Sequence, residues 1–548
     1  MVLALPDLMV GVGLDVDELQ RATPIVSMFL LGYVVVLPLA GRISDVAGRT
    51  PVLLGSLLVF AAGSLLTATA TGLPQAVTGR FLQGAGGGAL VPVTLALVTD
   101  LWPPDRRGVP LGVVGGVQEL GAVVGPLYGA LLLAVADWRA IFWANLVAGL
   151  GLAAALSYSR KGSRRRSTAF DGQGLDRSGA VLALVAVTAG GLAIVRPRPL
   201  EESIAWGGLV VPTIGDRGWS TPLALGAVAA ALGFLGRELT AHHPLLNLRR
   251  LPALVRSADV PGAALLGCAL GGVVLAFAVA DPAVEVVAPA GPWLLAGSAM
   301  ALVGFGWWQH RTPNPLLPAS AVRARPAWGA LVVSLFVGAA LVVVLVDVPV
   351  LVRTVVPDAT QLDAAFVLVR FLAAVPVGAL LGGWIVQSRS PALVTSVGMA
   401  VATSGLGGMS RWDVGSLSGP ADDLVLVAAG FGFGLAVAPV NAAILAATPR
   451  DTHGIASALV VVARMVGMLA GLSALTAIGL RRLYSVRADI ESPAVTCPAT
   501  PADCGAYQSA VREAVVAQLQ VTFTGAAVCA GLATLAAAVL LRRRRVPA

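Results

Sequence analysis

Apolar runs long enough to cross a lipid bilayer recur along this chain from one end to the other. A helix needs about 20 apolar residues to span the hydrocarbon, and only helices or closed barrels satisfy their backbone groups there. The runs are too long for barrel strands. Because 57% of the residues are hydrophobic and only 12% are charged, the composition also excludes an ordinary soluble protein. The sequence predicts an all-α polytopic membrane protein.

We expect about 16 membrane segments in three groups. Six precede a large basic loop, four lie in the middle and six close the chain. Their ranges are 1–12 (short), 24–40, 51–70, 76–101, 108–134 and 140–157; then 179–195, 222–235, 260–280 and 292–308; then 328–348, 364–386, 391–409, 424–446, 453–480 and 515–541. The expected domains are an N-terminal six-helix bundle over 1–158, a basic linker with two inserted helical hairpins over 159–327, and a C-terminal six-helix bundle over 328–548.

Lysine and arginine predict the orientation, because cytoplasmic loops carry an excess of both. One set of loops carries Arg42, Arg49, Arg106, Arg107, the run 160–166, Arg249, Arg250, Arg323, Arg325 and the run 542–545. We expect these loops and the C-terminus to lie in the cytoplasm, in a protein of the bacterial inner membrane. Binding of nucleic acid or acidic lipid is the alternative for the two runs, but the flanking membrane segments favour topology signals, so no nucleic-acid partner is expected.

The middle of the chain contains an internal repeat. RELTAHHPLLNLRRL (237–251) and QHRTPNPLLPASAVR (309–323) share Pro-Leu-Leu and each follows a pair of apolar runs. An inserted or duplicated hairpin explains the repeat, and since it adds two crossings it leaves the orientation of later segments unchanged. Chance similarity of two leucine-rich loops is the alternative.

The stretch GRISDVAGRT, residues 41–50, is an island of charge between two apolar runs. Its glycines allow a tight reversal, and its aspartate can meet a helix N-terminus or a basic partner. It is typical of a conformational latch, although topology alone would also explain its two arginines. The latch residues that we predict are Gly41, Asp45, Gly48, Arg49 and His453, the last of which begins a later helix.

Three further stretches accompany this one: RFLQGAGGGALVP (80–92), GGVQELGAVVGPLYGA (115–130) and DWRAIFW (137–143). Together the four motifs resemble the major facilitator superfamily in its fourteen-helix drug:proton antiporter branch. That resemblance implies the major facilitator fold, two six-helix bundles, here with extra central helical hairpins and a truncated first segment. The second stretch resembles the antiporter motif, in which small residues allow close helix approach and proline bends the axis; structural packing is the other reading. Its residues are Gly121, Gly125, Pro126 and Gly129.

A narrower resemblance is to the mycobacterial triacylglyceride exporters that work beside a lipid-carrying lipoprotein. It is carried by IVSMFLLGYVVVLPLAGRISDVAGR, by LVDVP (345–349) and by HGIASALVVVARMVGMLAGLSAL (453–475). In that family a glutamate and an arginine form an ion lock across the central cavity, and the matching positions are Glu119 and Arg464. The resemblance implies proton-coupled export, by alternating access, of a triacylglyceride-like membrane lipid and of amphipathic drugs. The alternative is a proton-coupled multidrug efflux pump.

The positions of ionisable side chains inside the apolar runs point to Glu119 and Arg464 without any reference to the family. Such a residue at the centre of a membrane helix costs at least about 2.5 kcal/mol, so each is a functional candidate. Besides the lock, we assign Arg80, Asp347 and Arg370 to a proton or substrate pathway. Asp347 lies near the outer end of its helix, where a structural role is also open.

The sequence gives little support for a histidine relay, a metal site or an enzyme active site. The four histidines fall in loops or at a helix start, which disfavours a histidine relay, and no His or Cys cluster has metal-ligand spacing. We therefore expect neither a metal nor a cofactor. No nucleophile with a base is evident, which disfavours an enzyme. Cys497 and Cys504 share an outward loop, where an oxidising environment favours a small disulfide; two free thiols are the alternative.

The sequence differs from the lipid exporters at its first apolar run and in one outward loop. The first apolar run has only about a dozen residues and cannot span about 30 Å, so we expect an upstream extension that completes the helix and supplies an intramembrane aspartate. The outward loop 410–423 is shorter than the hairpin of the lipid exporters, which weakens the transfer of their partner contacts.

Overall fold

The computed structural model describes most of the chain, and every regular element in the part that it describes is a helix. The described residues are 5–13, 19–103, 106–166, 178–179, 181–182, 185–186, 189–190, 206–211, 213, 221–240, 259–278, 290–313, 315–317, 323–356, 359–417, 419–497 and 504–542. The predicted all-α class is confirmed.

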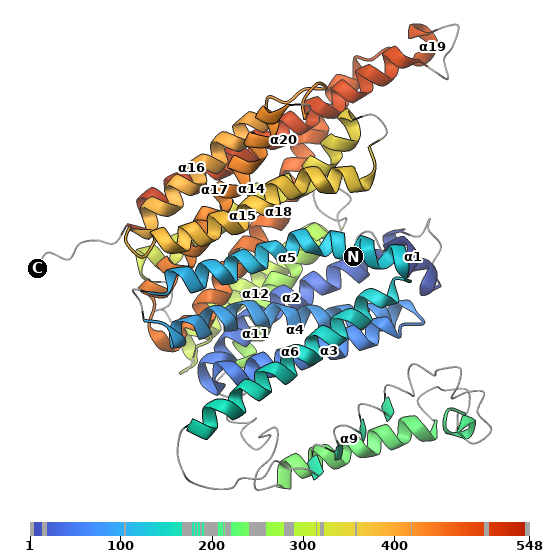
Figure 1. The fold of residues 1–548 in the computed structure, drawn as a ribbon, viewed down its shortest axis with the longest axis vertical. Helices are drawn as coiled ribbons and strands as arrows, with labels where there is room; N and C mark the ends of the chain where they lie inside the picture. The colour runs from blue at the N-terminus through green and yellow to red at the C-terminus, as the bar shows by residue number, and fades with distance from the viewer. Residues whose placement is uncertain are drawn as a thin grey trace, which may run out of the picture.

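Two helical bundles make up the body of the molecule (Figure 1). The first contains α1 (Leu5–Gly11), α2 (Leu19–Ala47), α3 (Arg49–Ala68), α4 (Leu73–Leu101), α5 (Gly108–Val135) and α6 (Arg139–Arg166). The second contains α14 (Arg325–Val355), α15 (Gln361–Ile385), α16 (Pro391–Met409), α17 (Pro420–Ala447), η7 (Arg450–Thr452), α18 (His453–Ala488), α19 (Pro493–Thr496) and α20 (Gly505–Leu540). Of the described helices, 10 are long and apolar enough to cross a membrane. The chain is therefore a multi-pass membrane protein.

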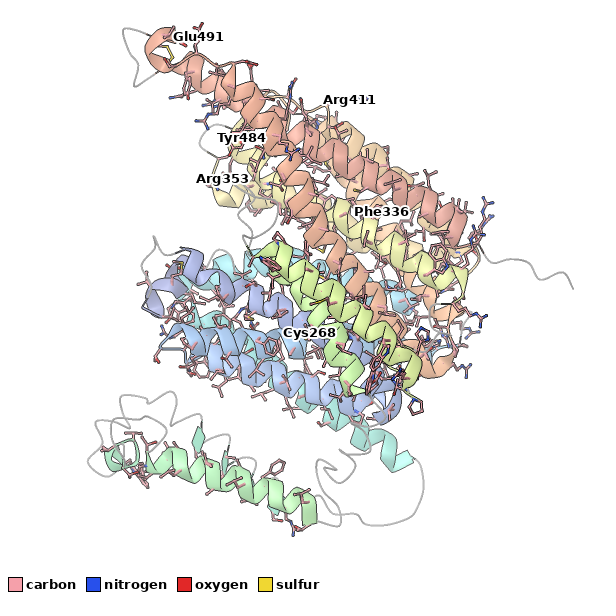
Figure 2. The ribbon with its side chains drawn as sticks, turned by 180° about the vertical axis from the view of Figure 1, so that it is seen from behind. Cys268, Phe336, Arg353, Arg411, Tyr484 and Glu491 are labelled. Atoms are coloured by element: carbon pink, nitrogen blue, oxygen red, sulfur yellow. A yellow bond between two sulfur atoms is a disulfide. The ribbon has the colours of Figure 1, made fainter. Side chains whose placement is uncertain are left out.

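The middle of the chain contributes η4 (Gly207–Leu209), α9 (Pro222–Thr240), α11 (Val260–Ala278) and α12 (Gly291–Arg311). Figure 1 shows α9 apart from both bundles. Helices α11 and α12 pair with each other, and α11 packs against α2 and α18. Seen from behind in Figure 2, this hairpin covers the outside of the molecule where the two bundles meet. The predicted segment 179–195 lies largely outside the described residues.

The small residues of the stretch 80–92 explain the packing of the first bundle. Helix α4 lies between α2 and α3. A Cβ atom on Gly84 would overlap the carbonyl oxygen of Phe29 in α2, and one on Gly86 would overlap the Phe60 backbone in α3. Glycine at these positions therefore lets three helices pack at backbone contact.

The two bundles touch each other mainly through α2 with α18 and α5 with α15, and also through α4 with α18 and α5 with α17. The closest contacts lie at the end that carries Arg49, Arg107 and Arg450, which we call the basic end. There, a Cβ atom on Gly108 of α5 would overlap the carbonyl oxygen of Gly383 in α15.

The bundles diverge toward the opposite end (Figure 1). In the last turns of α5, Leu131 is 66% exposed and Val135 is 75% exposed, while Leu132 and Leu133 still pack within the first bundle. The structure is therefore closed at the basic end and open at the other.

Candidate functional site

The charged stretch 41–50 closes the basic end through Asp45. Its carboxylate accepts hydrogen bonds from the backbone N–H groups of Gly454 (2.9 Å) and Ile455 (3.2 Å). These groups belong to the first turn of α18, whose N-cap residue Thr452 makes no side-chain capping bond. A helix N-terminus offers unpaired N–H groups and a positive dipole to a carboxylate. Asp45 thus supplies from the first bundle the cap that α18 lacks.

The local sequence explains why Asp45 reaches α18. Helix α2 ends at Ala47 and α3 begins at Arg49, with Gly48 between them at a φ of 91°. That backbone conformation favours glycine. The chain therefore reverses within one residue. Asp45 lies in the last turn of α2, just before this reversal, and its side chain reaches α18 of the other bundle.

Arg49 ties the carboxylate to the rest of the first bundle. Its guanidinium pairs with Asp45, donates to Ser44 Oγ at 2.9 Å and donates through Nε to Asp100 at 3.2 Å. Asp100 lies at the end of α4. It was missed in the sequence analysis, where a carboxylate at the end of an apolar run was the only signal for it.

His453 makes a second connection between the bundles. Its Nδ1 lies 3.0 Å from Thr99 Oγ1 of α4, and its Nε2 lies 3.2 Å from the Thr448 carbonyl oxygen. Arg107 supports the same corner by donating to the Thr99 carbonyl oxygen at 2.9 Å. Burial and the neighbouring Arg450 lower the pKa of the Arg107 guanidinium.

Two glycines bring the helices into contact at this point. A Cβ atom on Gly41 would lie 2.6 Å from the carbonyl oxygen of Gly454, so α2 and α18 meet backbone to backbone. We call the contacts of Gly41, Asp45, Arg49, His453 and Gly454 the basic-end gate. The structure thus brings four predicted latch residues together across the bundles, with Gly48 forming the turn; their role as a latch stays a prediction.

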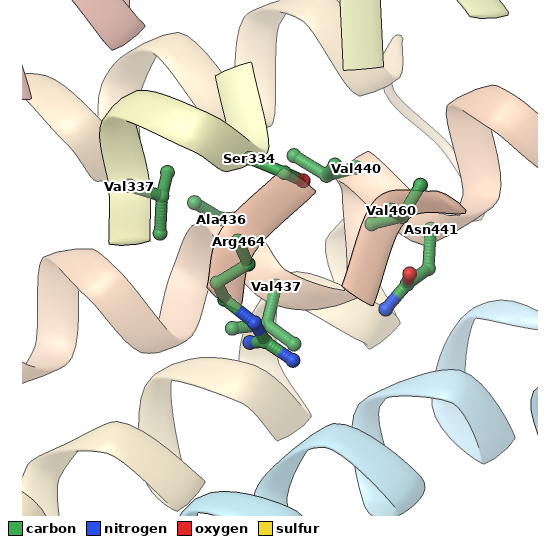
Figure 3. Close-up of a pocket in the computed structure, with 8 residues that line it drawn as sticks. All are labelled: Ser334, Val337, Ala436, Val437, Val440, Asn441, Val460 and Arg464. Atoms are coloured by element: carbon green, nitrogen blue, oxygen red, sulfur yellow. The ribbon is translucent and has the colours of Figure 1, made fainter. Parts of the chain in front are cut away.

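A pocket opens on the second bundle further along α18 (Figure 3). Its walls are mostly valine and alanine, with three polar side chains among them. The lining residues are Ser334, Val337, Ala436, Val437, Val440, Asn441, Val460 and Arg464. Arg464 is 7% exposed, and the buried Oδ1 atom of Asn441 has no hydrogen-bond partner among the described residues. Asn441 was missed in the sequence analysis, although an amide in an apolar run is a visible signal.

Helix α5 of the first bundle passes this pocket. A Cβ atom on Gly115 would lie 2.6 Å from the Val437 side chain, which lines the pocket with Arg464. Glu119 follows one helical turn later on α5, and residues four apart share a helix face. Its side chain lies outside the described residues, so the ion lock between Glu119 and Arg464 stays a prediction.

Arg80 lies inside the first bundle and does not line the pocket. Its Nε donates to the Ile25 carbonyl oxygen at 3.1 Å, its Nη1 donates to Gln83, and the guanidinium stacks 4.3 Å from the centre of the Phe29 ring. Gln83 in turn donates to Ser64 Oγ at 3.0 Å. Arg80 therefore joins α2, α3 and α4.

Asp347 and Arg370 lie within the second bundle, also away from the pocket lining. Asp347 of α14 is buried near the Thr522 side chain of α20. Arg370 of α15 pairs with Asp423 in the first turn of α17, where both side chains are partly exposed. The structure does not bring either residue to Arg464.

The glycines of the antiporter motif lie on the diverging half of α5. No described atom would come within 4 Å of a Cβ atom on Gly121, Gly125 or Gly129, so none of the described helices packs closely on them. The side chain of Pro126 lies outside the described residues.

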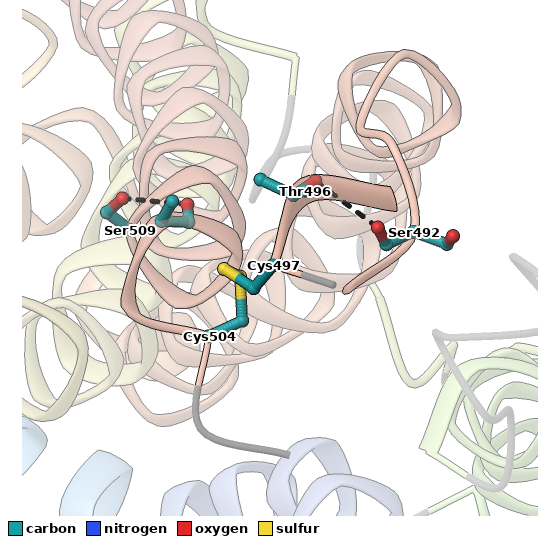
Figure 4. The surroundings of a disulfide bond; sticks show 6 residues. Ser492, Thr496, Cys497, Cys504 and Ser509 are labelled. Carbon is teal, nitrogen blue, oxygen red and sulfur yellow. Dashed lines mark hydrogen bonds between the residues drawn. A yellow bond between two sulfur atoms is a disulfide. The ribbon is translucent and has the colours of Figure 1, made fainter. Parts of the chain in front are cut away.

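The end opposite the basic end carries a disulfide between Cys497 and Cys504 (Figure 4). It closes the connection between α18 and α20, two helices of 36 residues each. Figure 1 shows both helices projecting beyond the rest of the second bundle. No group of three His, Cys, Asp or Glu residues in the described part of the chain could hold a metal.

Comparison with known proteins places these features in a family. The model of the Major Facilitator Superfamily matches residues 1–315. A triacylglyceride transporter of Mycolicibacterium hassiacum is 36% identical over 508 residues, which cover 91% of this chain and 78% of that protein. A triacylglyceride transporter of Mycobacteroides abscessus is 35% identical over 488 residues, with 87% and 78% covered.

Among solved structures, the crystal structure of the major facilitator transporter FucP in its outward conformation is similar over 98% of this chain and 93% of that one, with 15% identity and a TM-score of 0.46. The family match covers more than half of the sequence, and the two curated relatives span most of its length. This chain belongs to the major facilitator superfamily and is a transporter rather than an enzyme.

Proposed function

We propose that the chain is a secondary active exporter of the bacterial inner membrane that moves a triacylglyceride-like lipid, and amphipathic drugs, outward by alternating access coupled to protons. The observation that carries the proposal is the basic-end gate, in which Asp45 of one bundle caps α18 of the other. A contact of this kind stabilises one of two arrangements of the bundles, which alternating access requires.

The orientation of the cycle follows from charge. Arginines gather at the basic end, and cytoplasmic loops carry the excess of Lys and Arg, so we place this end and the C-terminus in the cytoplasm. With the gate closed, we infer that the substrate reaches the pocket around Arg464 from the outer side. Release of Asp45 from α18 would let the bundles separate at the cytoplasmic end.

We assign proton coupling to the pair of Glu119 and Arg464. Glu119 and Arg464 would pair when one side is closed and separate when Glu119 takes up a proton. The buried position of Arg464 supports this, because a charge shielded from water interacts strongly with an opposite charge nearby. Neither Asp347 nor Arg370 lines the same pocket, so we give them no part in the lock itself.

The substrate class is supported by the relatives and by the pocket lining. Both relatives described above are named triacylglyceride transporters. Five of the eight lining residues are valine or alanine, which suits acyl chains, while the Asn441 amide and the Arg464 guanidinium carry N–H donors for ester carbonyl oxygens. A lipid-carrying lipoprotein on the outer side is the partner that we propose to receive the lipid.

Transport by purified protein in vesicles tests the proposal. We would measure transfer of a fluorescent triacylglyceride with and without an imposed pH gradient, for wild type and for Arg464→Ala. Arg411→Ala is the matched control, because this arginine is exposed and remote from the pocket lining. We expect gradient-dependent transfer that only Arg464→Ala abolishes. Equal transfer with and without the gradient would contradict proton coupling.

Multidrug efflux is the second candidate. The mixed lining favours it, because polar groups in an apolar wall suit amphipathic molecules in general. The same vesicles separate the two functions if a fluorescent drug replaces the lipid. Gradient-driven movement of the drug without any lipid transfer would establish the efflux pump.

A further inference from the structure

The loop after α12 buries a leucine that the proposed function does not use. Leu316 is 0% exposed although its loop has no regular secondary structure. It lies in one hydrophobic cluster with Ile455 of α18 and with Leu39 of α2, which packs against that cluster. Leu316 is therefore buried together with residues of both bundles, where α11 also packs against α2 and α18. The cluster includes Ile455, whose N–H group Asp45 binds at the basic-end gate.

Asp259, the residue before α11, fixes this loop. It is 4% exposed and has a φ of 50°, a left-handed conformation that aspartate tolerates better than most residues. Its carboxylate accepts four hydrogen bonds, which come from Gly262 N (3.1 Å), Trp308 Nε1 (2.7 Å), Gln309 Nε2 (3.0 Å) and Leu316 N (2.8 Å). One side chain thus joins the start of α11, the end of α12 and the loop.

Gln309 extends the same network by one residue. Its Oε1 accepts a hydrogen bond from the N–H group of Leu317 at 3.1 Å. Both leucines of the second Pro-Leu-Leu are consequently held by side-chain acceptors of the hairpin. The first Pro-Leu-Leu, at 244–246, lies outside the described residues.

We propose that Asp259 is a positioning residue for the basic-end gate: it holds Leu316 in the hydrophobic cluster that α2 and α18 share, and so makes the hairpin α11–α12 a brace for the closed gate. Separating α2 from the start of α18 would draw Leu39 away from Ile455 and expose Leu316 to water. Apolar burial that exists in only one of two states shifts the population toward that state. The inference rests on the proposed alternating access, to which it adds a structural role for the middle hairpin.

Distance measurement by double electron–electron resonance tests the brace. The background replaces the two free cysteines, Cys268→Ser and Cys529→Ser, and keeps the disulfide. Spin labels at Ala47 and Ser388 then report on the basic end, since both residues are exposed and they end α2 and follow α15 in opposite bundles. The measurement needs no substrate, so its result is independent of the transport assay.

Asp259→Ala and Leu316→Ala should each lower the ratio of closed to open basic ends at least about fivefold. The double variant should fall no further than the stronger single variant, because both remove one contact. Leu316→Met, which nearly conserves volume, should restore most of the wild-type ratio. Val303→Ala is the matched control on α12, where the side chain is 74% exposed, and it should leave the ratio unchanged.

A wild-type ratio for Leu316→Ala in monodisperse protein overturns the brace, whatever Asp259→Ala does. If Asp259→Ala fails to fold, the two Leu316 variants still decide, because neither removes a buried polar group. A wild-type protein that transfers no lipid, while the Asp259 and Leu316 variants still lower the ratio, would instead count against the proposed function and leave the brace standing.

Discussion

Asp45 of α2 and Gly454 of α18 are joined by a hydrogen bond of 2.9 Å between residues 409 positions apart in the chain. The bond crosses from one bundle to the other. Because Arg49 pairs with the same carboxylate and also contacts Asp100, the first bundle presents Asp45 to α18 in a fixed position. The gate therefore combines a helix N-terminus with a side chain that is held in place before the bundles meet.

Asp45→Asn should weaken the closed gate. The amide oxygen can still accept one hydrogen bond, but the negative charge at the helix N-terminus is lost, which costs about 0.3–1 kcal/mol when exposed and up to about 2 kcal/mol when partly buried. Spin labels at Ala47 and Ser388 should report a larger open population. Asp489→Asn is the control, since this carboxylate is exposed at the opposite end of α18. An unchanged distance distribution together with normal transport would contradict the latch.

Gly41→Ala should prevent the closed gate from forming. Its Cβ atom would lie 2.6 Å from the Gly454 carbonyl oxygen and 3.0 Å from the Ile455 Cα atom, distances at which one helix must move. We expect the open population to dominate and lipid transfer to fall by at least about tenfold, which corresponds to about 1.4 kcal/mol.

Gly55→Ala is the matched control for that substitution. Nothing lies within 4 Å of its added Cβ atom, and alanine favours a helix interior over glycine by about 0.5–1 kcal/mol. The control should therefore melt at the wild-type temperature or slightly above it and keep the wild-type gate. A closed gate in Gly41→Ala would show that α2 and α18 have more room than the structure indicates.

Arg80→Ala tests whether this arginine serves transport or the fold. Its guanidinium bonds Ile25 and Gln83 and stacks on Phe29, and it is 6% exposed. Leaving the buried Gln83 without this donor should cost about 1–3 kcal/mol of stability, which thermal melting in detergent would measure. Arg482→Ala, an exposed arginine on α18, should have no effect. An unchanged melting temperature with lost transport would instead assign Arg80 to a proton or substrate pathway.

The membrane-embedded parts of the helices were predictable, and their extensions were not. The segment 391–409 was expected and found with the same bounds, as α16. Helix α18 was expected to end at 480 but continues to Ala488, and α20 was expected to begin at 515 but begins at Gly505. The added turns carry polar sequence such as RRLYSVRA. Hydropathy detects the apolar part of a helix and misses turns that continue into water.

The residues of the basic-end gate were predictable from the sequence only where a short local pattern marked them. Asp45 stood out because a charged residue interrupts two apolar runs, and a helix start at His453 was visible as well. The partners Thr99 and Asp100 depend on how α4 approaches α18 and α3, which is a matter of tertiary packing. Asp259 was missed for the same reason, since its four donors come from both ends of the hairpin.

Asn441→Leu, in the pocket beside Arg464, should weaken lipid transfer without destabilising the protein. The Oδ1 atom of Asn441 is buried without a hydrogen-bond partner among the described residues, and an unsatisfied buried polar group costs about 1–3 kcal/mol. Leucine branches at the same carbon as asparagine, although it is larger, and Asn441→Leu removes that group. The free protein should therefore melt at the same temperature or higher. Transfer of the fluorescent triacylglyceride should nevertheless fall about fivefold to tenfold, because the amide no longer donates to an ester carbonyl oxygen in the pocket.

Ser457→Ala is the control that distinguishes lipid binding by the Asn441 amide from the effect on stability of removing any buried polar group without a hydrogen-bond partner. The Ser457 hydroxyl is also buried without a partner among the described residues, but it does not line the pocket. Its removal should raise stability in the same way and leave transfer unchanged. Titration of the lipid should show the Asn441→Leu defect as a higher half-saturating concentration, since the amide acts in binding. Wild-type transfer by Asn441→Leu would show that the ester groups are bound elsewhere in the cavity.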